Sequence, residues 1–459
     1  MNFVLVPKIR VRMSAKSRRI TQVGEPRCTR SRQEGMGMRI ISAAAVAGLM
    51  GVSILTTVPS QAADSDIKRV VVNGKKLNQA EAKVKQVVDG DTLRVDVQGD
   101  NSGPFYVRNS GINTMEKGQC HYKQATRQLK RLAGKKILLR YAGNSSKLNK
   151  SSGRIRKQMS AFTRKGKDLQ NELVKRGLAF PYNFGTETLN SDLYLASAQL
   201  AAQQGRGLFD VDACGVGPQA EAQLDLVVNY DPGYKGRENL SKKFVRLVNN
   251  GPVAVNLGGW RLSTGRSHFA FPRRAVVPLG GEVVVRMGSG QNTATEFFWG
   301  GGRRELAVPG QSRYSGNGVY LIDPDGDARF WNFHPCAVDC THPVMGKIKI
   351  SVNYDPPGNP DPPNQETVSF LNTGDQRADL TYLVAEVRYS TYEFPKGSYL
   401  DPGETAVIRM GKGTQGRLDH YLGRSSKYLP GENVGGLIKL RDDRHVELAC
   451  ESWGRKSKC

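Results

Sequence analysis

The stretch Val87-Val88-Asp89-Gly90-Asp91-Thr92 is the most informative segment for the fold of this chain. After it, apolar and polar residues alternate, as at Val95 and Val97, which is the period of a β-strand. Asp89-Gly90-Asp91 is a turn sequence at a strand end, where a carboxylate is held on a rigid base. The segment therefore predicts acidic side chains at the ends of neighbouring strands.

An arginine and a second polar group follow, at Arg108 and at Asn113-Thr114-Met115-Glu116. A hard divalent cation needs oxygen ligands that converge from separate strands. A carboxylate such as Glu116 can polarise a water, and a guanidinium such as Arg108 can neutralise charge that builds on a phosphate. This combination of groups is typical of a phosphodiesterase.

These residues resemble the thermonuclease (staphylococcal nuclease-like) family, whose marks are Asp-Gly-Asp-Thr, then Arg-(x)4-Asp-Thr-Pro-Glu, then a Gly-Arg strand. The resemblance runs from about Lys68 to about Cys214 and includes two late landmarks, Asn171–Ala179 and Gly205–Phe209. It implies an OB-type five-stranded barrel with three helices that cleaves DNA and RNA with calcium. The implied enzyme is a phosphodiester hydrolase of low sequence specificity.

The resemblance also implies a role for each matching residue. Asp91, Asn113 and Thr114 match the calcium ligands of the family, Thr114 through its backbone carbonyl. Glu116 matches the general base, and Arg108 matches the arginine that binds the phosphate. Asn113 stands where the family usually has aspartate, which removes one negative charge and should weaken calcium binding. An alternative therefore stays open: a non-catalytic nucleic-acid or cell-surface binding protein with a degenerate barrel.

The second catalytic arginine is ambiguous in the sequence. Gly153-Arg154 reproduces the Gly-Arg dipeptide, whereas counting back from Gly177 favours Arg156. Positions 154 and 156 share one face of a strand. We expect Arg154 to be catalytic, with Arg156 as the alternative.

The chain has 459 residues, too many for one core, and its formal net charge of +25 favours a polyanionic partner. The apolar run from Ile40 to Val58, followed by Pro59-Ser60-Gln61-Ala62, predicts a secretory signal that is cleaved after Ala62. Translation that starts at Met36 or Met38 would shorten its basic leader. We expect a secreted protein with no stable membrane span after cleavage.

Six cysteines lie after the predicted cleavage site, an even number that indicates three disulfides in an exported chain. Sequence alone permits about 15 pairings. Position favours Cys120–Cys214, Cys336–Cys340 and Cys450–Cys459, because each pair then lies within or just after one domain. A zinc site near His334 and His342 is the alternative, but it lacks CxxC spacing.

The chain repeats itself after Gln223, where short strands are separated by glycine and proline. Val245–Asn249 recurs as Val368–Asn372, and Phe271-Pro272 recurs as Phe394-Pro395, with an offset of 123 residues (372 minus 249). Each copy is therefore a domain, and strands at this spacing predict a β-sandwich. The first copy, with Asn256–Trp260, resembles the lamin-tail domain, an immunoglobulin-like sandwich; the second copy is the weaker match.

The expected organisation is multidomain, α+β and all-β, with two immunoglobulin-like sandwiches after the barrel. We expect a leader over 1–62, a polar lead-in over 63–83, the catalytic barrel over 84–214, a linker over 215–223, and sandwiches over 224–340 and 347–459. Three helices are predicted over His121–Leu132, Asp168–Arg176 and Ser191–Gln204. The buried face predicted for the last helix contains Leu193, Leu195, Ala196, Leu200 and Ala201, with Tyr194 as an additional candidate. The sandwiches contribute no catalytic constellation, so we expect them to be dispensable for cleavage and to hold cell envelope or nucleic acid.

Two further features have a structural and a functional interpretation. The cations Lys123, Arg127, Lys130, Arg131, Lys135 and Lys136 are a solvated helix face or a track for a nucleic-acid backbone. Asp323-Pro324-Asp325-Gly326-Asp327 has the alternating carboxylates of a calcium loop but lacks the downstream glutamate, so a hairpin turn is favoured. The sequence shows no Ser/His/Asp constellation and no nucleotide-binding glycine loop, which argues against those classes of enzyme.

Overall fold

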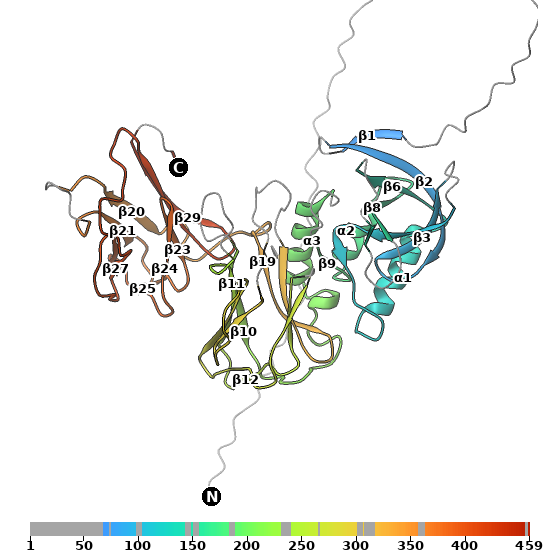
Figure 1. Cartoon of the computed structure of the whole chain (residues 1–459), viewed down its shortest axis with the longest axis horizontal. Helices are drawn as coiled ribbons and strands as arrows, with labels where there is room; N and C mark the ends of the chain where they lie inside the picture. Colours follow the sequence, from blue (N-terminus) through green and yellow to red (C-terminus); the bar gives the residue numbers. More distant parts are fainter. Residues whose placement is uncertain are drawn as a thin grey trace, which may run out of the picture. The chain divides into compact units, whose positions relative to one another are not determined.

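A computed structural model describes most of the chain from Lys68 to Cys459 (Figure 1). The description omits 1–67, 73–74, 98–102, 143–147, 150–155, 183–188, 231–239, 265–266, 301–305, 307–316, 357–362 and 455–457. The described residues all belong to one compact unit. The predicted leader, its cleavage site after Ala62, and Arg154 lie outside them.

The first region is a closed barrel, coloured blue to teal in Figure 1. Its sheet contains β1 (Lys68–Val72), β2 (Lys75–Val87), β3 (Thr92–Val97), β4 (Phe105–Asn109), β6 (Lys136–Tyr141), β7 (Leu148–Asn149) and β8 (Arg156–Thr163). The strand order is β1-β2-β3-β4-β8-β6, and β6 also pairs with β2, which closes five strands into a barrel. Leu93, Val107 and Ile137 are fully buried inside it. The barrel has the OB-like fold that the sequence predicts.

The polar lead-in predicted over 63–83 is wrong for the residues from Lys68 onward. β1 and most of β2 occupy this segment, and β2 pairs with both β3 and β6. Leu77, Ala80 and Ala82 point into the protein and are buried. Small apolar residues alternate with charged ones here, so β2 has the period of a strand but little hydrophobicity.

Three helices pack on the barrel, as predicted: α1 (Tyr122–Ala133), α2 (Leu169–Val174) and α3 (Ser191–Gln203). The short 3-10 helix η3 (Gly207–Phe209) follows α3. The predicted buried face of α3 is partly wrong, because Leu193 and Leu200 are 45% and 40% exposed. Tyr194, the additional candidate for this face, is fully buried, and its hydroxyl donates to Asp168 Oδ2 at 2.8 Å. A hydrogen-bonded polar side chain, that of Tyr194, therefore lies on the inner face of α3, whereas Leu193 and Leu200 do not.

Two β-sandwiches with the same topology follow the barrel. The first contains β10 (Leu224–Asn229), β11 (Phe244–Asn249), β12 (Val255–Asn256), β13 (Arg261–Ser263), β14 (His268–Ala270), β15 (Val276–Val277), β16 (Glu282–Arg286), β17 (Glu296–Phe298), β18 (Asn317–Ile322) and β19 (Ala328–His334). The second contains β20 (Ile348–Asn353), β21 (Thr367–Asn372), β22 (Ala378–Asp379), β23 (Val384–Val387), β24 (Ser390–Glu393), β25 (Tyr399–Leu400), β26 (Thr405–Arg409), β27 (Asp419–Tyr421), β28 (Gly436–Arg441) and β29 (Glu447–Trp453). Sheets β10-β11-β16-β17 and β14-β13-β18-β19 correspond to β20-β21-β26-β27 and β24-β23-β28-β29. The structure confirms the internal repeat.

A buried asparagine at equivalent positions shows why part of the repeated sequence recurs. The Asn249 amide donates to the Val253 and Pro278 carbonyls at 2.7 and 3.0 Å, and its Oδ1 accepts the Gly251 N–H. Asn372 donates to the Gln376 and Leu400 carbonyls at 2.8 and 3.0 Å. Both side chains are fully buried, so the repeated asparagine holds a turn in each sandwich.

The barrel and the first sandwich share an apolar core. The Phe180 ring lies 3.9 Å from the Tyr320 ring, and Phe209 contacts Trp331 edge-on at 5.1 Å between centroids. The Gln199 amide on α3 donates to the Pro335 carbonyl at 2.9 Å. Removal of the sandwiches, which we expect from the sequence to be dispensable for cleavage, would therefore expose Phe180 and Phe209 to water.

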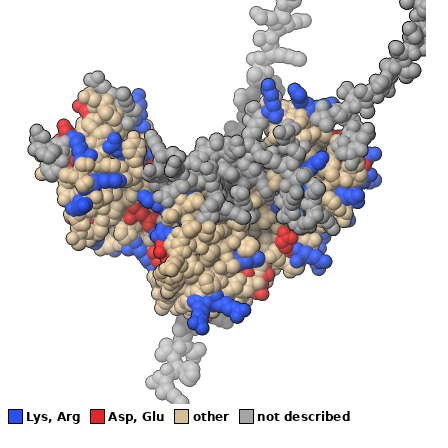
Figure 2. All heavy atoms as spheres, in the orientation of Figure 1, with Lys and Arg blue, Asp and Glu red and all other residues tan. Residues whose placement is uncertain are grey.

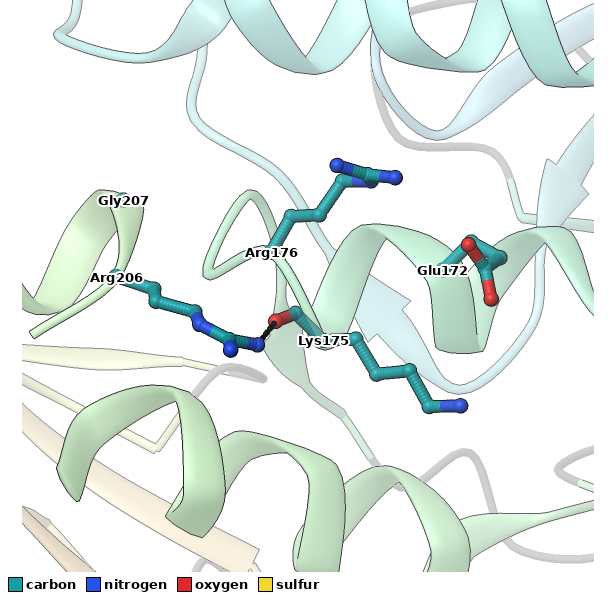
Figure 3. Close-up of a pocket in the computed structure, with 5 residues that line it drawn as sticks. All are labelled: Glu172, Lys175, Arg176, Arg206 and Gly207. Carbon is teal, nitrogen blue, oxygen red and sulfur yellow. Dashed lines mark hydrogen bonds between the residues drawn. The ribbon is translucent and has the colours of Figure 1, made fainter. Parts of the chain in front are cut away.

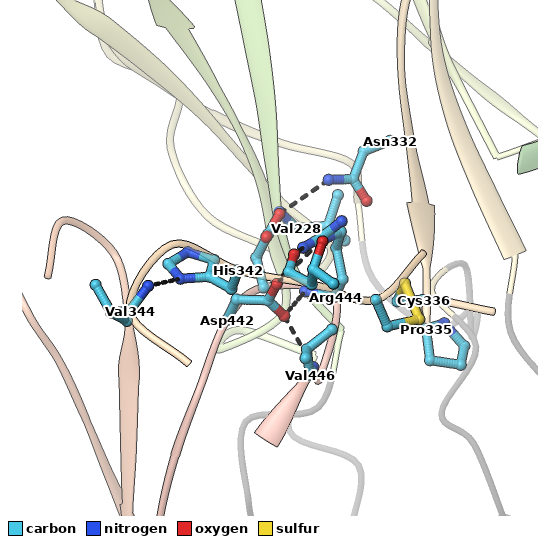
Figure 4. Close-up of polar contacts among 12 residues, drawn as sticks. Val228, Asn332, Pro335, Cys336, His342, Val344, Asp442, Arg444 and Val446 are labelled. Carbon is cyan, nitrogen blue, oxygen red and sulfur yellow. Dashed lines mark hydrogen bonds and ion pairs between the residues drawn. A yellow bond between two sulfur atoms is a disulfide. The ribbon is translucent and has the colours of Figure 1, made fainter. Parts of the chain in front are cut away.

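The two sandwiches meet through polar and aromatic contacts around the β28–β29 turn (Figure 4). Asp443 Oδ2 accepts the Asn332 amide at 2.8 Å, and burial raises the pKa of Asp443 to about 6. Tyr230 stacks on His334 and on His445, with centroids 4.5 and 4.2 Å apart. Burial lowers the pKa of His334 to about 3 and that of His445 to about 2. Both imidazoles are therefore neutral at pH 7.

The six cysteines form the three disulfides that position favours. Cys120–Cys214, Cys336–Cys340 and Cys450–Cys459 have Cα–Cα distances of 6.0, 5.7 and 5.8 Å. His121 lies near the first pair, but the joined sulfurs are not thiolates and do not offer a metal site. The disulfides are compatible with an extracellular protein. Among the described residues, no helix has both the length and the apolar character required to cross a membrane.

Candidate active site

The Asp89-Gly90-Asp91 turn joins β2 to β3 and places Asp91 at the start of β3. The Val88 N–H donates to the Thr92 carbonyl at 2.9 Å, and the Asp91 N–H donates to Asp89 Oδ1 at 3.0 Å. A β-carbon on Gly90 would lie 2.7 Å from the Ala125 β-carbon on α1. Glycine thus lets the turn approach α1 closely, which fixes the direction of Asp91.

Asp91 is a buried carboxylate with several donors. Its Oδ2 accepts the Thr114 N–H at 3.0 Å and the Thr114 hydroxyl at 3.1 Å. The same oxygen lies 2.9 Å from Arg108 Nη2. The side chains of Arg108 and Asp91 are only 6% and 8% exposed, so they form a buried ion pair that hydrogen bonds support.

Arg108 links Asp91 to the loop that carries the other predicted ligands. Its Nη1 donates to the Ile112 carbonyl at 2.9 Å, and its Nη2 donates to Asn113 Oδ1 at 2.8 Å. β5 (Ile112–Asn113) is held in turn by pairing with β9 (Phe180–Pro181). The structure therefore brings four of the residues singled out from the sequence into one cluster: Asp91, Arg108, Asn113 and Thr114.

Asp89 is a further acidic group beside the cluster, and it was not among the predicted site residues. Burial, together with the neighbouring Asp91 carboxylate, raises the pKa of Asp89 to about 6. Its place in the Asp-Gly-Asp tripeptide is the signal that could have identified it. Two carboxylates, the Asn113 amide and the Thr114 carbonyl form a set of oxygen donors that suits a hard cation such as calcium.

Glu116 lies in the loop between β5 and α1, two residues after Thr114. Its side chain is exposed, whereas its backbone N–H donates to Gln119 Oε1 at 2.7 Å. The loop is thus anchored through its backbone, and the carboxylate faces solvent. No ion pair involves Glu116 within the described part of the chain.

Arg156 joins the cluster through Thr92. Its Nη1 donates to Thr92 Oγ1 at 3.2 Å, and this hydroxyl donates to Asp91 Oδ1 at 3.0 Å. Arg156 on β8 is in register with Tyr106 on β4, which is in register with Arg94 on β3. The Arg94 guanidinium lies 6.0 Å from the centre of the Tyr106 ring. A row of two arginines and a tyrosine therefore crosses three strands next to the cluster.

The structure explains the Asp323–Asp327 segment and some of the six cations near α1. Asp323–Asp327 is the hairpin turn between β18 and β19, where Asp323 Oδ1 accepts the Asp327 N–H at 2.9 Å. Of the six cations near α1, Lys136 pairs with Glu81 at 2.7 Å, and Arg131 hydrogen-bonds Gln128. Lysine and arginine side chains lie over both the barrel and the sandwiches on the face shown in Figure 2.

Comparison with known families identifies one region of the chain. Residues 219–331 match the Lamin Tail Domain family. The match covers β10–β18 and the first part of β19, so the first sandwich is a lamin tail domain, as predicted. A comparison with curated proteins found no match.

Proposed function

We propose that the protein is a secreted nuclease that hydrolyses phosphodiester bonds of DNA and RNA with calcium and with little sequence preference. The observation that carries this proposal is the cluster in which Arg108 contacts both Asp91 and Asn113 while Thr114 donates to Asp91. It joins anionic, amide and cationic groups at one end of a rigid barrel. An exposed carboxylate, Glu116, follows in the same loop.

Asp91, Asn113 and the Thr114 carbonyl would hold the calcium ion, with Asp89 close by. Bound calcium would supply positive charge to the phosphate oxygens. The buried Asp91 is fixed by Thr114 and Thr92, so it offers its oxygens without reorganisation. The neutral Asn113 makes the site less anionic than a site with two aspartates.

Glu116 would act as the general base. Its side chain is exposed, so water reaches it, and its loop is held by the Gln119 side chain. Glu116 would take a proton from the water that attacks phosphorus. The electron pair of the new P–O bond comes from that water, and the leaving oxygen departs with the electrons of the broken P–O bond.

Arg108 and Arg156 would bind the phosphate and the charge that develops on it. A guanidinium offers a planar fork of N–H donors that matches phosphate oxygens. The contact of Arg156 with Thr92 ties it to the Asp91 cluster, which supports a role for Arg156; Arg154, the other candidate, lies outside the described residues. Tyr106, between Arg94 and Arg156, would support a neighbouring nucleotide by stacking, which is tolerant of sequence.

The test incubates the full chain with plasmid DNA and with single-stranded RNA, with calcium or with a chelator. We expect both substrates to be cleaved with calcium and to stay intact with the chelator. A Glu116→Gln protein purified in the same way controls for a contaminating nuclease. Absence of cleavage under every metal condition would remove the enzyme proposal.

A second candidate is a binding protein with a degenerate barrel. The observation that favours it is the full engagement of the Arg108 Nη groups by Asp91, Asn113 and two carbonyls. Nucleic-acid binding without cleavage in the same assay would support this candidate. In either case we propose that the sandwiches hold the protein on cell envelope or on polymeric nucleic acid; the second sandwich, which has the topology of the first, would be a further lamin tail domain.

A further inference from the structure

A second basic site lies where α2 ends beside η3. Glu172, Lys175, Arg176, Arg206 and Gly207 line a pocket with a volume of about 550 Å³ (Figure 3). The five residues come from two segments: the end of α2 with the turn after it, and the segment that enters η3. None of them belongs to the Asp91–Arg108 cluster.

The backbone around this pocket is fixed by close packing. Gly177 has φ +62°, and a β-carbon there would overlap the Arg206 carbonyl. The Leu208 N–H donates to the Gly177 carbonyl at 2.8 Å. Arg206 Nη1 donates to the Lys175 carbonyl at 3.2 Å, so this side chain also joins the two segments. The cations therefore project from a rigid base.

Within the described residues, the positive charge of the pocket is not compensated. Glu172, the one carboxylate among the described lining residues, lies 3.0 Å from Nζ of Lys167, which is not a lining residue. Lys175, Arg176 and Arg206 are exposed, and none of them pairs with a carboxylate in the part of the chain that the structure describes.

Two surface arginines of the second sandwich, in contrast, form ion pairs with aspartates. Arg377 pairs with Asp401 at 2.8 Å, and Arg409 pairs with Asp419 at 3.0 Å. In contrast to the pocket cations, these two arginines have acidic partners, so they provide a charge-matched control for the pocket. Cations that lack such partners are available for an anionic ligand.

We propose that this pocket binds phosphates of a nucleic-acid backbone and anchors the substrate away from the Asp91–Arg108 cluster. The proposal rests on the proposed function for the identity of the substrate. Two guanidiniums and an ammonium suit phosphate oxygens. Among the described residues that line the pocket none is aromatic, so they offer bases no stacking platform, and we expect binding that does not depend on sequence.

The test measures binding of a short DNA duplex to the full chain in chelator, at several salt concentrations. The double variant Lys175→Gln/Arg176→Gln removes two charges and leaves the Arg206 contact in place. We expect the slope of log K against log salt to fall by about 2 and affinity to fall on the order of 10-fold at low salt, equally for unrelated sequences. Arg377→Gln/Arg409→Gln, which removes the same charge from paired sites, should change neither quantity appreciably.

The same variants are then assayed for cleavage of a dinucleotide with calcium, a substrate too short to reach a separate anchoring site. Unchanged dinucleotide turnover together with weaker duplex binding supports the proposal. Equal losses in the pocket variant and the control variant would overturn it, as would an unaltered salt slope. Loss of binding to vesicles of anionic lipid with normal duplex binding would also overturn it. If the protein cleaves nothing but the salt slope falls as expected, the nuclease proposal fails and the anchoring site stands.

Discussion

The tripeptide Asp-Gly-Asp occurs twice in this protein, at 89–91 in the barrel and at 325–327 in the first sandwich. Each copy lies in a turn between two strands beside a buried ion pair of aspartate and arginine. In the barrel Arg108 Nη2 lies 2.9 Å from Asp91, and in the sandwich Arg329 Nε lies 2.7 Å from Asp323. The local sequence and the local electrostatics are thus nearly alike.

The two copies differ in the groups that other segments bring to them. Arg329 donates to the Val211 and Gly215 carbonyls, each at 2.7 Å. The sandwich cluster therefore fixes the backbone at these two residues. The barrel cluster receives Thr114 and Asn113 from a loop that continues to the exposed Glu116. The tripeptide therefore makes a turn in both places. Only the copy in the barrel receives, from the loop after β4, the groups that the proposed reaction requires.

The largest expected effect is a difference in turnover between variants near the two copies. Glu116→Gln should lower turnover by about two to four orders of magnitude, because it removes the general base while nucleic-acid binding survives. Asp325→Asn, an exposed substitution in the other tripeptide, should leave turnover unchanged. Steady-state cleavage and binding assays on both variants check this. Equal activity of Glu116→Gln and the parent protein would place the base elsewhere.

The next effect separates the copies by stability. Arg329→Ala leaves Asp323, which is fully buried, without its cation, and should cost about 3–5 kcal/mol of unfolding free energy. Arg377→Ala breaks an exposed pair and should cost about 1 kcal/mol or less. Denaturant unfolding measures both values. A small loss for Arg329→Ala would mean that the sandwich cluster does not hold the structure together.

We expect acid to destabilise the sandwiches, because protons bind to His334 and His445 when the chain unfolds. Both have folded-state pKa values below the usual value of about 6.5, so the unfolded chain binds protons more readily. The two neutral histidines therefore contribute their full stabilisation above about pH 6.5. As the pH falls to 4.5, the free energy of unfolding decreases by about 3 kcal/mol for each imidazole. Asp443, whose pKa is raised to about 6, offsets part of this loss.

Unfolding of the parent protein and of His445→Gln across this pH range is the measurement. The variant lacks one titrating imidazole and should lose less stability between pH 6.5 and pH 4.5. Parallel profiles would show that His445 is not held neutral at the junction of the sandwiches.

The smallest expected effect concerns the metal. Asn113→Asp adds a charge to the barrel cluster without changing its reach, so half-saturation by calcium should fall by about tenfold or less. Asn292→Asp adds the same charge to an exposed position of the first sandwich and serves as the control. Titration of calcium against cleavage gives both values. An unchanged half-saturation in Asn113→Asp would show that this residue does not face the ion.

Much of the fold was predictable because its signals are local or repeated. The turn at Asp89–Asp91, the three helices and the offset between Asn249 and Asn372 all follow from the order of residues. The cluster of Asp91 with Arg108 and Thr114 was predictable as a set of matching landmarks. The ion pair inside that cluster was not, because no spacing rule says which oxygen a guanidinium chooses.

Two features of the structure differ from the sequence-based predictions for physical reasons. β2 was missed because Ala80 and Ala82 carry too little hydrophobicity to mark a buried face. The face of α3 was wrong because Gln199 is buried by bonds to the first sandwich, a partner that lies far away in the sequence. Contacts between domains of this kind are set by tertiary packing, and the pattern within one helix does not encode them.

The shared core of barrel and sandwich has a consequence for the order of synthesis. The barrel leaves the ribosome first, but the Arg329 contact with Val211 spans 118 residues, and Trp331, which covers Phe209, lies just beyond Arg329. At about 5–20 residues per second, this part of the chain takes about 6–24 s to emerge. During that interval the barrel presents Phe180 and Phe209 uncovered, so a nascent chain needs protection from aggregation until β19 has been made.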